Sequence, residues 1–399
     1  MTLRLLFLTE SYWPRVGGTP TQVRMLAGEM VRRGHTVTVV TRRWEAAHPD
    51  REERDGIRIV RLGPTGMGPW KKWGFGFRVW PALLRYENVD AVYCAGMRVL
   101  GVPAVLTGRW KGWRSVLRPV SCGEMSGAFF DEGLRRMGLG TAAWPIRLGL
   151  MVRNRILKRA DRFVAISSAI EEELRAAGIP PEKIVRIPNA VDEERFRPVG
   201  PEEKQRWRAA LGLESGWRVA IYTGRLVRAK GLPELLRVWA RLAGEWPEGH
   251  LVLVGSGGND LGNCEAELRA FCRERGLERR VTFTSDVADV APWLKASDLF
   301  LFPTRNEAFG ISLIEAMACG LPAVSTAVGG VRDIVEDGLN ALVVPAGDEV
   351  ALEAAIRRIW SDPAFGERLG AAARRTVIER FSKAMSASRY EALFSGQER

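Results

Sequence analysis

Short apolar runs alternate with amphipathic stretches along the whole chain of 399 residues, and this alternation limits the fold more than any other feature. Such runs predict buried strands of a parallel sheet, because crossover helices cover both faces of that kind of sheet. The stretches between them, for example residues 19–33, 233–242 and 265–275, carry apolar residues at helical spacing. The sequence therefore predicts an α/β architecture with doubly wound parallel sheets.

The predicted strands form two groups, separated at residues 187–201 by a charged stretch with several prolines. The first group is 3–9, 36–41, 57–62, 91–94, 115–120, 163–166 and 184–187, and the second is 219–223, 250–254, 281–284, 299–302, 323–325 and 341–344. We predict an N-terminal domain of residues 1–193 and a C-terminal domain of residues 194–379, each with its own sheet. Ligands of such folds bind at the carboxyl ends of the strands.

The composition excludes several classes of protein. The chain is 46% hydrophobic and 27% charged, as globular proteins are, and no apolar run reaches the ~20 residues of a membrane-spanning helix. The five cysteines are scattered without a CxxC pair, and there are only three histidines. We therefore expect reduced thiols, no metal site, no secretory leader and a cytoplasmic protein.

The net charge of +12 lies almost wholly in the first half of the chain. Residues 1–200 hold 33 Lys and Arg against 20 Asp and Glu, whereas the remainder hold 26 against 27. The excess is densest at residues 56–120, which also hold Trp70, Trp73, Trp80, Trp110 and Trp113. A basic surface with aromatics suits a nucleic acid, an anionic membrane or an acidic substrate, and composition leaves the three open.

The strongest local pattern is NEAFGISLIEAMACGLP at residues 306–322, which follows a predicted strand. The backbone N–H groups of Phe309, Gly310 and Ile311 stand at the start of a helix, where they suit an anionic phosphate. The carboxylates of Glu307 and Glu315 suit sugar and ribose hydroxyls. The alternative is an ordinary helix with an acidic start, but an unpaired glutamate is rare on a helix as apolar as this one.

The second pattern is TGRLVRAKGL at residues 223–232, again directly after a predicted strand. Gly224 gives room at the end of the strand, and Arg225 and Lys230 are well placed to clamp a diphosphate. A solvated basic loop is the alternative. The GxxxxGK[ST] spacing of a P-loop is absent.

Two weaker patterns also carry glycine in the loop after a predicted strand, where the backbone can approach a ligand closely. They are Gly17-Gly18 in TESYWPRVGGTPT and Gly255 in LVGSGG. Neither contains GxGxxG, so dinucleotide binding is poorly supported, and an ordinary loop is the alternative reading of each.

Taken in order, these segments resemble the nucleotide-sugar-dependent glycosyltransferases of family 4, whose GT-B fold has two Rossmann-like domains facing a central cleft. The resemblance covers nearly the whole chain and includes YWPRVGG, RRGHTVTVVT, FVAISSAIEEEL, IVRIPNAVDEERFRP and the block from NEAFG to VVPAGD. It implies a retaining α-glycosyltransferase that moves a hexosyl group from a UDP- or GDP-sugar by same-face substitution. The implied acceptor is a glycan or a lipid-linked molecule, and no metal or other cofactor is required.

The resemblance also implies roles for single residues. Arg225 and Lys230 would contact the diphosphate, Glu307 the donor sugar and Glu315 the ribose. The helix around residues 380–399 would pack back on the first domain. The full candidate donor-binding set is Gly17, Gly18, Gly224, Gly255, Phe309, Gly310, Ile311 and Glu315, and the candidate catalytic set is Glu307, Arg225, Lys230 and Glu124.

Glu124 enters that set because the chain departs from the family. Many relatives carry a histidine after the fifth strand of the first domain, where this chain has VSCGEMSG. A carboxylate there could accept a hydrogen bond from the acceptor hydroxyl or stabilise the positive sugar ring. The alternative is that Glu124 caps the following helix or pairs with one of the many arginines.

Two other functions remain as alternatives. A nucleotide-sugar epimerase shares the fold and the donor, but it would more often show acid/base histidines. A nucleic-acid-binding protein fits the basic charge, yet no motif for it is present, so we expect no nucleic-acid partner.

A membrane is a further candidate partner. Residues 70–80 (WKKWGFGFRVW) and 109–114 (RWKGWR) join basic side chains to aromatics, which predicts peripheral binding at the inner face of the cell membrane. A half-buried aromatic cluster with solvated charges is the alternative.

Overall fold

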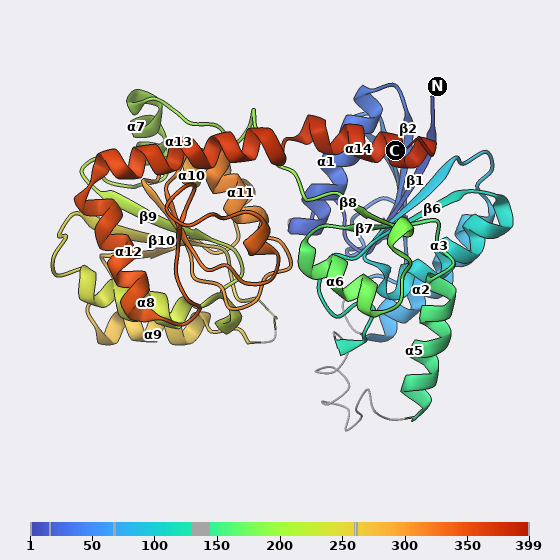
Figure 1. Ribbon diagram of the computed structural model, residues 1–399, viewed down its shortest axis with the longest axis horizontal. Helices are drawn as coiled ribbons and strands as arrows, with labels where there is room; N and C mark the ends of the chain where they lie inside the picture. The colour runs from blue at the N-terminus through green and yellow to red at the C-terminus, as the bar shows by residue number, and fades with distance from the viewer. Residues whose placement is uncertain are drawn as a thin grey trace. The chain divides into compact units, whose positions relative to one another are not determined.

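A computed structural model describes residues 2–15, 17–66, 69–128, 144–258, 260 and 262–397, without the side chains of residues 69–73. The chain divides into two compact units, Met1–Asn189 with Lys383–Arg399, and Ala190–Ser382 (Figure 1). The chain thus passes between the units after residues 189 and 382, where the sequence suggested 193 and 379. Each unit contains a largely parallel sheet with helices on it, which confirms the predicted doubly wound α/β class.

The first unit is built on an eight-stranded sheet of order β3-β4-β2-β1-β5-β6-β7-β8. Its strands are β1 (Arg4–Thr9), β2 (Thr36–Arg42), β3 (Arg51–Arg54), β4 (Ile57–Leu62), β5 (Ala91–Ala95), β6 (Arg114–Arg118), β7 (Arg162–Ala165) and β8 (Ile184–Arg186). The edge strand β3 pairs antiparallel with β4, while the other pairs are parallel. The strand β3 was not predicted because its four residues, REER, are polar and mostly exposed and carry no apolar alternation.

Helices cover both faces of this sheet. They are α1 (Gly18–Arg32), α2 (Pro69–Leu84), α3 (Met97–Lys111), α5 (Trp144–Leu157), α6 (Ser168–Ala176), the short η1 (Pro181–Lys183) and α14 (Lys383–Ser395). Alternate residues of a strand face opposite sides. On β5, Tyr93 faces the core cluster that holds α1 and α14, and Val92 lies next to Gly108 of α3. α3 therefore packs on the face opposite to α1, with α2 and α5 beside it.

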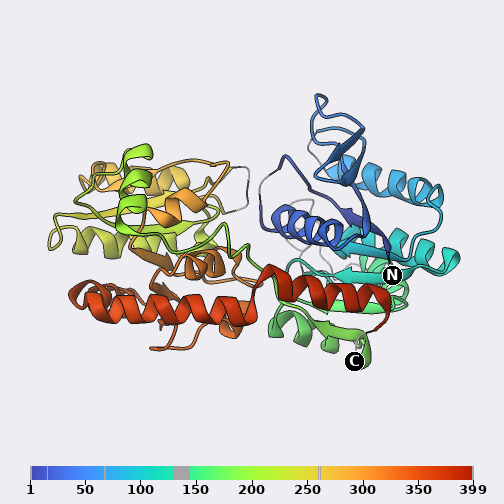
Figure 2. The same ribbon diagram turned by 90° about the horizontal axis from the view of Figure 1, so that it is seen from above.

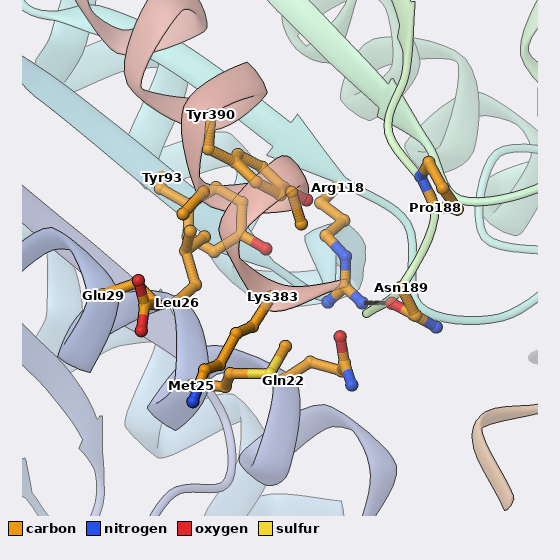
Figure 3. Close-up of a pocket in the computed structure, with 12 residues that line it drawn as sticks. Gln22, Met25, Leu26, Glu29, Tyr93, Arg118, Pro188, Asn189, Lys383 and Tyr390 are labelled. Carbon is orange, nitrogen blue, oxygen red and sulfur yellow. Dashed lines mark hydrogen bonds between the residues drawn. The ribbon is translucent and has the colours of Figure 1, made fainter. Parts of the chain in front are cut away.

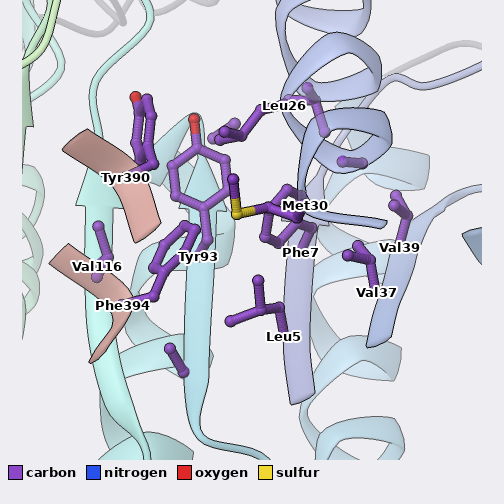
Figure 4. Packing of buried hydrophobic residues seen from close by; sticks show 14 of the residues in the cluster. Leu5, Phe7, Leu26, Met30, Val37, Val39, Tyr93, Val116, Tyr390 and Phe394 are labelled. Atoms are coloured by element: carbon purple, nitrogen blue, oxygen red, sulfur yellow. The ribbon is translucent and has the colours of Figure 1, made fainter. Parts of the chain in front are cut away.

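The last helix of the chain completes the core of the first unit, next to α1 (Figures 1 and 2). Tyr390 and Phe394 of α14 pack on Phe7 of β1 and Tyr93 of β5 (Figure 4). The ring centroids of Tyr93 and Tyr390 lie 5.5 Å apart, edge to face. Aromatic pairs of this kind stabilise by about 1 kcal/mol beyond the area that they bury. The apolar, aromatic end of the sequence therefore belongs to the first unit.

The second unit has a six-stranded parallel sheet of order β11-β10-β9-β12-β13-β14. Its strands are β9 (Arg218–Thr223), β10 (Gly249–Val254), β11 (Val281–Phe283), β12 (Leu299–Phe302), β13 (Ala323–Ser325) and β14 (Leu342–Val343). Its helices are α7 (Pro201–Ala210), η2 (Arg228–Lys230), α8 (Leu232–Leu242), α9 (Glu265–Glu274), α10 (Ala291–Lys295), α11 (Ile311–Ala318), η3 (Gly329–Asp333), α12 (Glu349–Ser361) and α13 (Pro363–Arg380).

The strand order of the second unit reverses between β9 and β12. From β9 the chain proceeds outward to β10 and β11, and from β12 it proceeds the other way to β13 and β14. The loops that leave the carboxyl ends of β9 and β12 therefore part in opposite directions. That is the place where ligands bind in open α/β sheets.

Candidate active site

The two loops at this reversal carry the two strongest sequence patterns, and the structure brings them together. Gly231, which follows the β9 loop, lies so close to the β12 loop that an added Cβ would stand 2.0 Å from the carbonyl oxygen of Pro303. The backbone N–H of Arg305 also donates to the carbonyl of Ala229 at 2.8 Å. Neighbouring strands thus place Lys230 and Glu307 in one site, although 76 residues lie between them.

Lys230 and Glu307 form an ion pair at the centre of this site. The ammonium of Lys230 donates to Oε2 of Glu307 at 2.6 Å and to the carbonyl of Asn306 at 3.3 Å. Oε1 of Glu307 accepts from the backbone N–H of Ala308 at 3.1 Å. The Lys230 side chain is nearly buried, so the pair also satisfies a cation that has little water around it. A cation and a hydrogen-bond acceptor therefore stand side by side.

Two glycines fix the loop that carries Glu307. Gly330 of η3 donates its N–H to the carbonyl of Glu307 at 3.0 Å. A Cβ on Gly329 would lie 2.1 Å from that same carbonyl oxygen, and a Cβ on Gly330 would lie 2.2 Å from the carbonyl oxygen of Ala308. Both glycines lie in the block from NEAFG to VVPAGD, but no role was predicted for them. The Gly-Gly pair in AVGGVRD was the available signal, because such contacts exclude any side chain.

The start of α11 is open to an anion. Gly310 precedes the helix with φ +114°, and no side chain caps it. The first turn of an α-helix leaves its backbone N–H groups without intrahelical partners, and its dipole favours negative charge. Gly310 and Ile311 therefore present two of the backbone donors that the sequence predicted for a phosphate, whereas the N–H of the third, Phe309, donates to Oε1 of Glu307 at 3.5 Å.

Arg225 lies in the β9 loop, largely exposed, with its guanidinium 3.3 Å from Asp260. The hydroxyl of Tyr222 donates to the carbonyl of Arg225 at 3.0 Å and so holds the loop. Gly224 and Gly255 have a packing reason to be glycine. A Cβ on Gly224 would lie 2.6 Å from the Tyr222 hydroxyl, and one on Gly255 would lie 2.1 Å from the Gly224 carbonyl. Their predicted contact with the donor stays a prediction.

Glu315 is partly buried on α11, and its side chain makes no hydrogen bond or ion pair within the described part of the chain. Burial raises the pKa of its carboxyl to about 8, and the charge of Arg195 opposes this shift only in part. A carboxyl without a partner on an apolar helix fits a group kept for a ligand. Its predicted contact with a ribose is not tested by this geometry.

The remaining candidates belong to the first unit. Gly17 and Gly18 stand where the β1 loop enters α1, with Gly17 as the N-cap residue. Glu124 is fully buried after β6, and both of its carboxylate oxygens accept backbone N–H groups. The donors are Val120 and Ser121 to Oε1, at 3.0 and 3.2 Å, and Met97 to Oε2, at 3.0 Å.

This arrangement of Glu124 is the one expected of a capping residue. Met97 is the first residue of α3, and Arg98 lies 3.6 Å from the same carboxylate. Burial raises the pKa of Glu124, while Arg98 lowers it. Glu124 therefore caps α3, which precedes it in the chain, whereas the alternative named the following helix. Its pairing with Arg98 agrees with the other part of that alternative, and its acceptor-side role stays a prediction.

Glu173 of α6 is a residue that the sequence analysis missed. It accepts the backbone N–H groups of Gly123 at 2.8 Å and of Met125 at 2.9 Å. Its only signal was its place in SSAIEEEL, and no local pattern links α6 to a loop 48–50 residues away. Glu173 and Glu124 together fix the loop that follows β6.

A small cavity of about 10 Å³ lies between α1, α14 and β6, apart from every predicted site residue (Figure 3). It has room for about one water molecule. Arg118 is buried at its edge and donates to the side-chain oxygen of Asn189. This cavity therefore belongs to the core of the first unit.

Two further findings concern the described residues alone. No group of three or more His, Cys, Asp or Glu side chains in the described ranges is arranged to hold a metal ion. None of the described helices combines the length and the apolar character needed to cross a membrane.

Comparison with known proteins places the whole chain in one family. The model of glycosyl transferases group 1 matches residues 203–376, and that of glycosyltransferase family 4 matches residues 16–195. A D-inositol 3-phosphate glycosyltransferase of Kineococcus radiotolerans is 30% identical, over 90% of this chain and 86% of the relative. The GDP-mannose-dependent α-(1-6)-phosphatidylinositol monomannoside mannosyltransferase of Mycolicibacterium smegmatis is 27% identical, over 98% of each chain.

Comparison with solved structures agrees with this family assignment. Sucrose-phosphate synthase of Thermosynechococcus elongatus superposes with a TM-score of 0.82 at 25% identity, over 99% of this chain and 98% of that one. Anabaena HepE in complex with UDP-glucose has a TM-score of 0.78 at 22% identity, over 99% and 100%. The second likeness shows the fold alone. The predicted family and fold are confirmed: the chain is a glycosyltransferase of family 4 with the GT-B fold.

Proposed function

We propose that this glycosyltransferase transfers a hexosyl group, with retention of the α configuration, from a nucleoside-diphosphate sugar to a glycan or lipid-linked acceptor. The ion pair of Lys230 and Glu307 at the strand-order reversal, beside the open start of α11, is the observation that carries the proposal. Two comparisons support the donor class. HepE was solved with UDP-glucose, and the Mycolicibacterium relative is GDP-mannose-dependent. A UDP- or GDP-sugar is therefore the proposed donor.

The reaction breaks the bond between the sugar and the diphosphate. Negative charge then grows on the leaving diphosphate, and positive charge grows on the sugar ring. Lys230, Arg225 and the N–H groups at the start of α11 stabilise the diphosphate, at about 3 kcal/mol for each well-placed donor. The carboxylate of Glu307 accepts hydrogen bonds from sugar hydroxyls and faces the positive charge of the ring.

Lys230 gains a second partner in this proposal. In the free protein its ammonium is held by Glu307, which avoids an unpaired cation at a nearly buried position. When the donor binds, the diphosphate supplies a second anion to the same ammonium. The site is thus organised before binding, and little reorganisation is needed during the reaction.

The acceptor enters from the face that the diphosphate leaves, and the leaving phosphate takes the proton of the acceptor hydroxyl. The new glycosidic bond forms as the sugar–phosphate bond breaks, so the configuration at the anomeric carbon is kept. The proposal requires no metal, because two cations and a helix N-terminus supply the positive charge.

Product analysis with a panel of UDP- and GDP-sugars tests this function. We expect an α-linked product by NMR and full activity in excess chelator. A β-linked product would contradict the proposed stereochemistry. Turnover of the nucleotide sugar with no acceptor present would instead support the epimerase alternative.

We also propose peripheral binding to an anionic membrane at the inner face of the cell membrane. Phe77 and Trp80 of α2 and Trp110 of α3 are exposed, next to exposed Arg78 and Arg109. Trp113 is buried, so it is not part of the membrane-binding surface that the sequence suggested. The side chains of Trp70 and Trp73 lie outside the described residues. Flotation with anionic liposomes at low salt tests the proposal, and absence of binding there would reject it.

A further inference from the structure

An exposed apolar stripe runs along α5, and neither the donor site nor the comparisons account for it. It consists of Trp144, Leu148, Met151 and Val152, whose exposed fractions lie between 46% and 76%. Their spacing of four, seven and eight residues from the first places all four on one side of a helix. Large apolar side chains gathered on one exposed side mark an interaction surface.

The other side of α5 is committed to the first unit. Leu157 is buried and packs on Gly101, where an added Cβ would lie 2.7 Å from its side chain. Leu150 is equally close to Gly127. Arg153 donates to the carbonyl of Arg98 at 3.1 Å. The helix is therefore fixed on α3 and on the loop after β6, and the stripe faces away from these contacts.

The positive charge of α5 indicates that the partner of the apolar stripe is anionic. The helix has no Asp or Glu, and it carries Arg147, Arg153 and Arg155, of which the first and last are exposed. A hollow of about 540 Å³ next to Met151 is lined by two cations, Arg155 and Lys158, and by one carboxylate, Glu173, among the described residues. Apolar side chains with arginines beside them and a tryptophan at one end are typical of helices that lie in the interface of an anionic bilayer.

We propose that α5 is a membrane-docking element of this enzyme, in addition to the exposed aromatics of α2 and α3. Its stripe inserts into the boundary between headgroups and acyl chains, and Arg147 and Arg155 contact the lipid phosphates. The proposal rests on the membrane association proposed above and names a surface for it. Neither of the tryptophan-rich segments, residues 70–80 and 109–114, includes α5.

The position of α5 connects membrane docking to the predicted acceptor side. The amide of Asn154 donates to the carbonyl of Met125 at 2.8 Å, so α5 is tied to the loop that follows β6. That loop is the predicted acceptor side. Docking through α5 would hold the loop next to the lipid headgroups, which is where a lipid-linked acceptor presents its hydroxyl.

A fluorescent label on α5 tests the proposal. Met151→Cys is labelled with an environment-sensitive dye in a Cys122→Ser background, because Cys122 is the one exposed native cysteine in the described part of the chain. Val350→Cys on α12, at a position 78% exposed, is the matched control. The vesicles are phosphatidylcholine with or without phosphatidylglycerol. We expect a blue shift at position 151 with phosphatidylglycerol only, and no shift at position 350.

A paired variant measures the effect on binding. Leu148→Ser with Met151→Ser should weaken vesicle binding about tenfold or more, because both changes remove apolar area from the bilayer. Val350→Ser should bind like the wild type. Transfer to a soluble acceptor should be unchanged in the double variant, which also shows that it is folded.

The outcomes are distinguishable. If the protein binds vesicles while the label at position 151 stays in water, α5 is rejected and membrane association through another surface stands. If no vesicle binding occurs, both proposals fail. If the label shifts without vesicles as the protein concentration rises, the stripe joins two copies of the chain, and the membrane role of α5 is overturned.

Discussion

The two units differ in how their candidate sites are built. In the second unit the site comes from two short segments, each next to its own strand, and the sheet joins them where its strand order reverses. In the first unit the loop after β6 is held by carboxylates, and one of these, Glu173, lies on α6, far along the sequence. Contiguous motifs therefore specify the proposed donor site, whereas the predicted acceptor side depends on long-range contacts that no motif displays.

The largest expected effect falls in the second unit. Glu307→Gln, Arg225→Ala and Lys230→Ala should each lower turnover at least ~100-fold, because each removes a group that acts on developing charge or on the sugar. Arg228→Ala is the control: this neighbouring cation is exposed and pairs with Glu267. Steady-state kinetics measure the loss, and circular dichroism should be unchanged. Near-wild-type rates in a site variant would remove that residue from the site.

The second prediction compares two glycines of the second unit, Gly329 and Gly338. Gly329→Ala should cost about 1–3 kcal/mol of unfolding free energy more than Gly338→Ala, and it should also slow turnover. Both residues have positive φ, but only Gly329 has a carbonyl 2.1 Å from the added Cβ, while Gly338 has open space. Denaturant unfolding compares the two. Equal losses would mean that the close contact with Glu307 does not matter.

For the first unit, Glu124→Gln and Glu173→Gln should leave donor affinity unchanged and lower the rate of transfer. A glutamine amide replaces one acceptor oxygen by a donor, so a buried backbone N–H loses its partner, at about 1–3 kcal/mol. Glu171→Gln, on the same helix as Glu173 but paired with Arg175, is the control. Donor titration and transfer kinetics separate the two effects. A weaker donor affinity would break the division of roles between the units.

The smallest effect concerns pH. Burial raises the pKa of Glu315 from 4.5 to about 8, so the folded state holds this proton more tightly than the unfolded state does. The resulting stability is fully present below about pH 4.5 and is lost as the pH rises through 8. The full shift would be worth about 5 kcal/mol, but the side chain is only partly buried, so relative to Glu315→Gln we expect the wild type to lose about 1–3 kcal/mol over that range. Thermal unfolding at several pH values checks this, and parallel curves would show that Glu315 is not buried as described.

The same contrast explains what could be read from the sequence. The inner strands and the loops of the proposed donor site were predictable, because buried strands require apolar runs and turns at strand ends favour glycine. The strand β3 was not predictable, since an exposed edge strand can pair with its neighbour without an apolar pattern. The sequence shows Gly329 and Gly330 as a glycine pair, but their role could not be predicted, because it depends on a contact with Glu307 in the folded chain. Glu173 could not be found, since a side chain that accepts backbone N–H groups from a distant loop leaves no local trace.

The central claim is that the loops after β9 and β12 hold the diphosphate of the donor. Calorimetric titration of the full chain with its preferred nucleotide sugar tests it most directly, in the wild type, Lys230→Ala and Arg228→Ala. The account predicts at least a tenfold weaker dissociation constant for Lys230→Ala and a wild-type value for Arg228→Ala, because only Lys230 stands beside Glu307 at the reversal. Wild-type affinity in Lys230→Ala would contradict it.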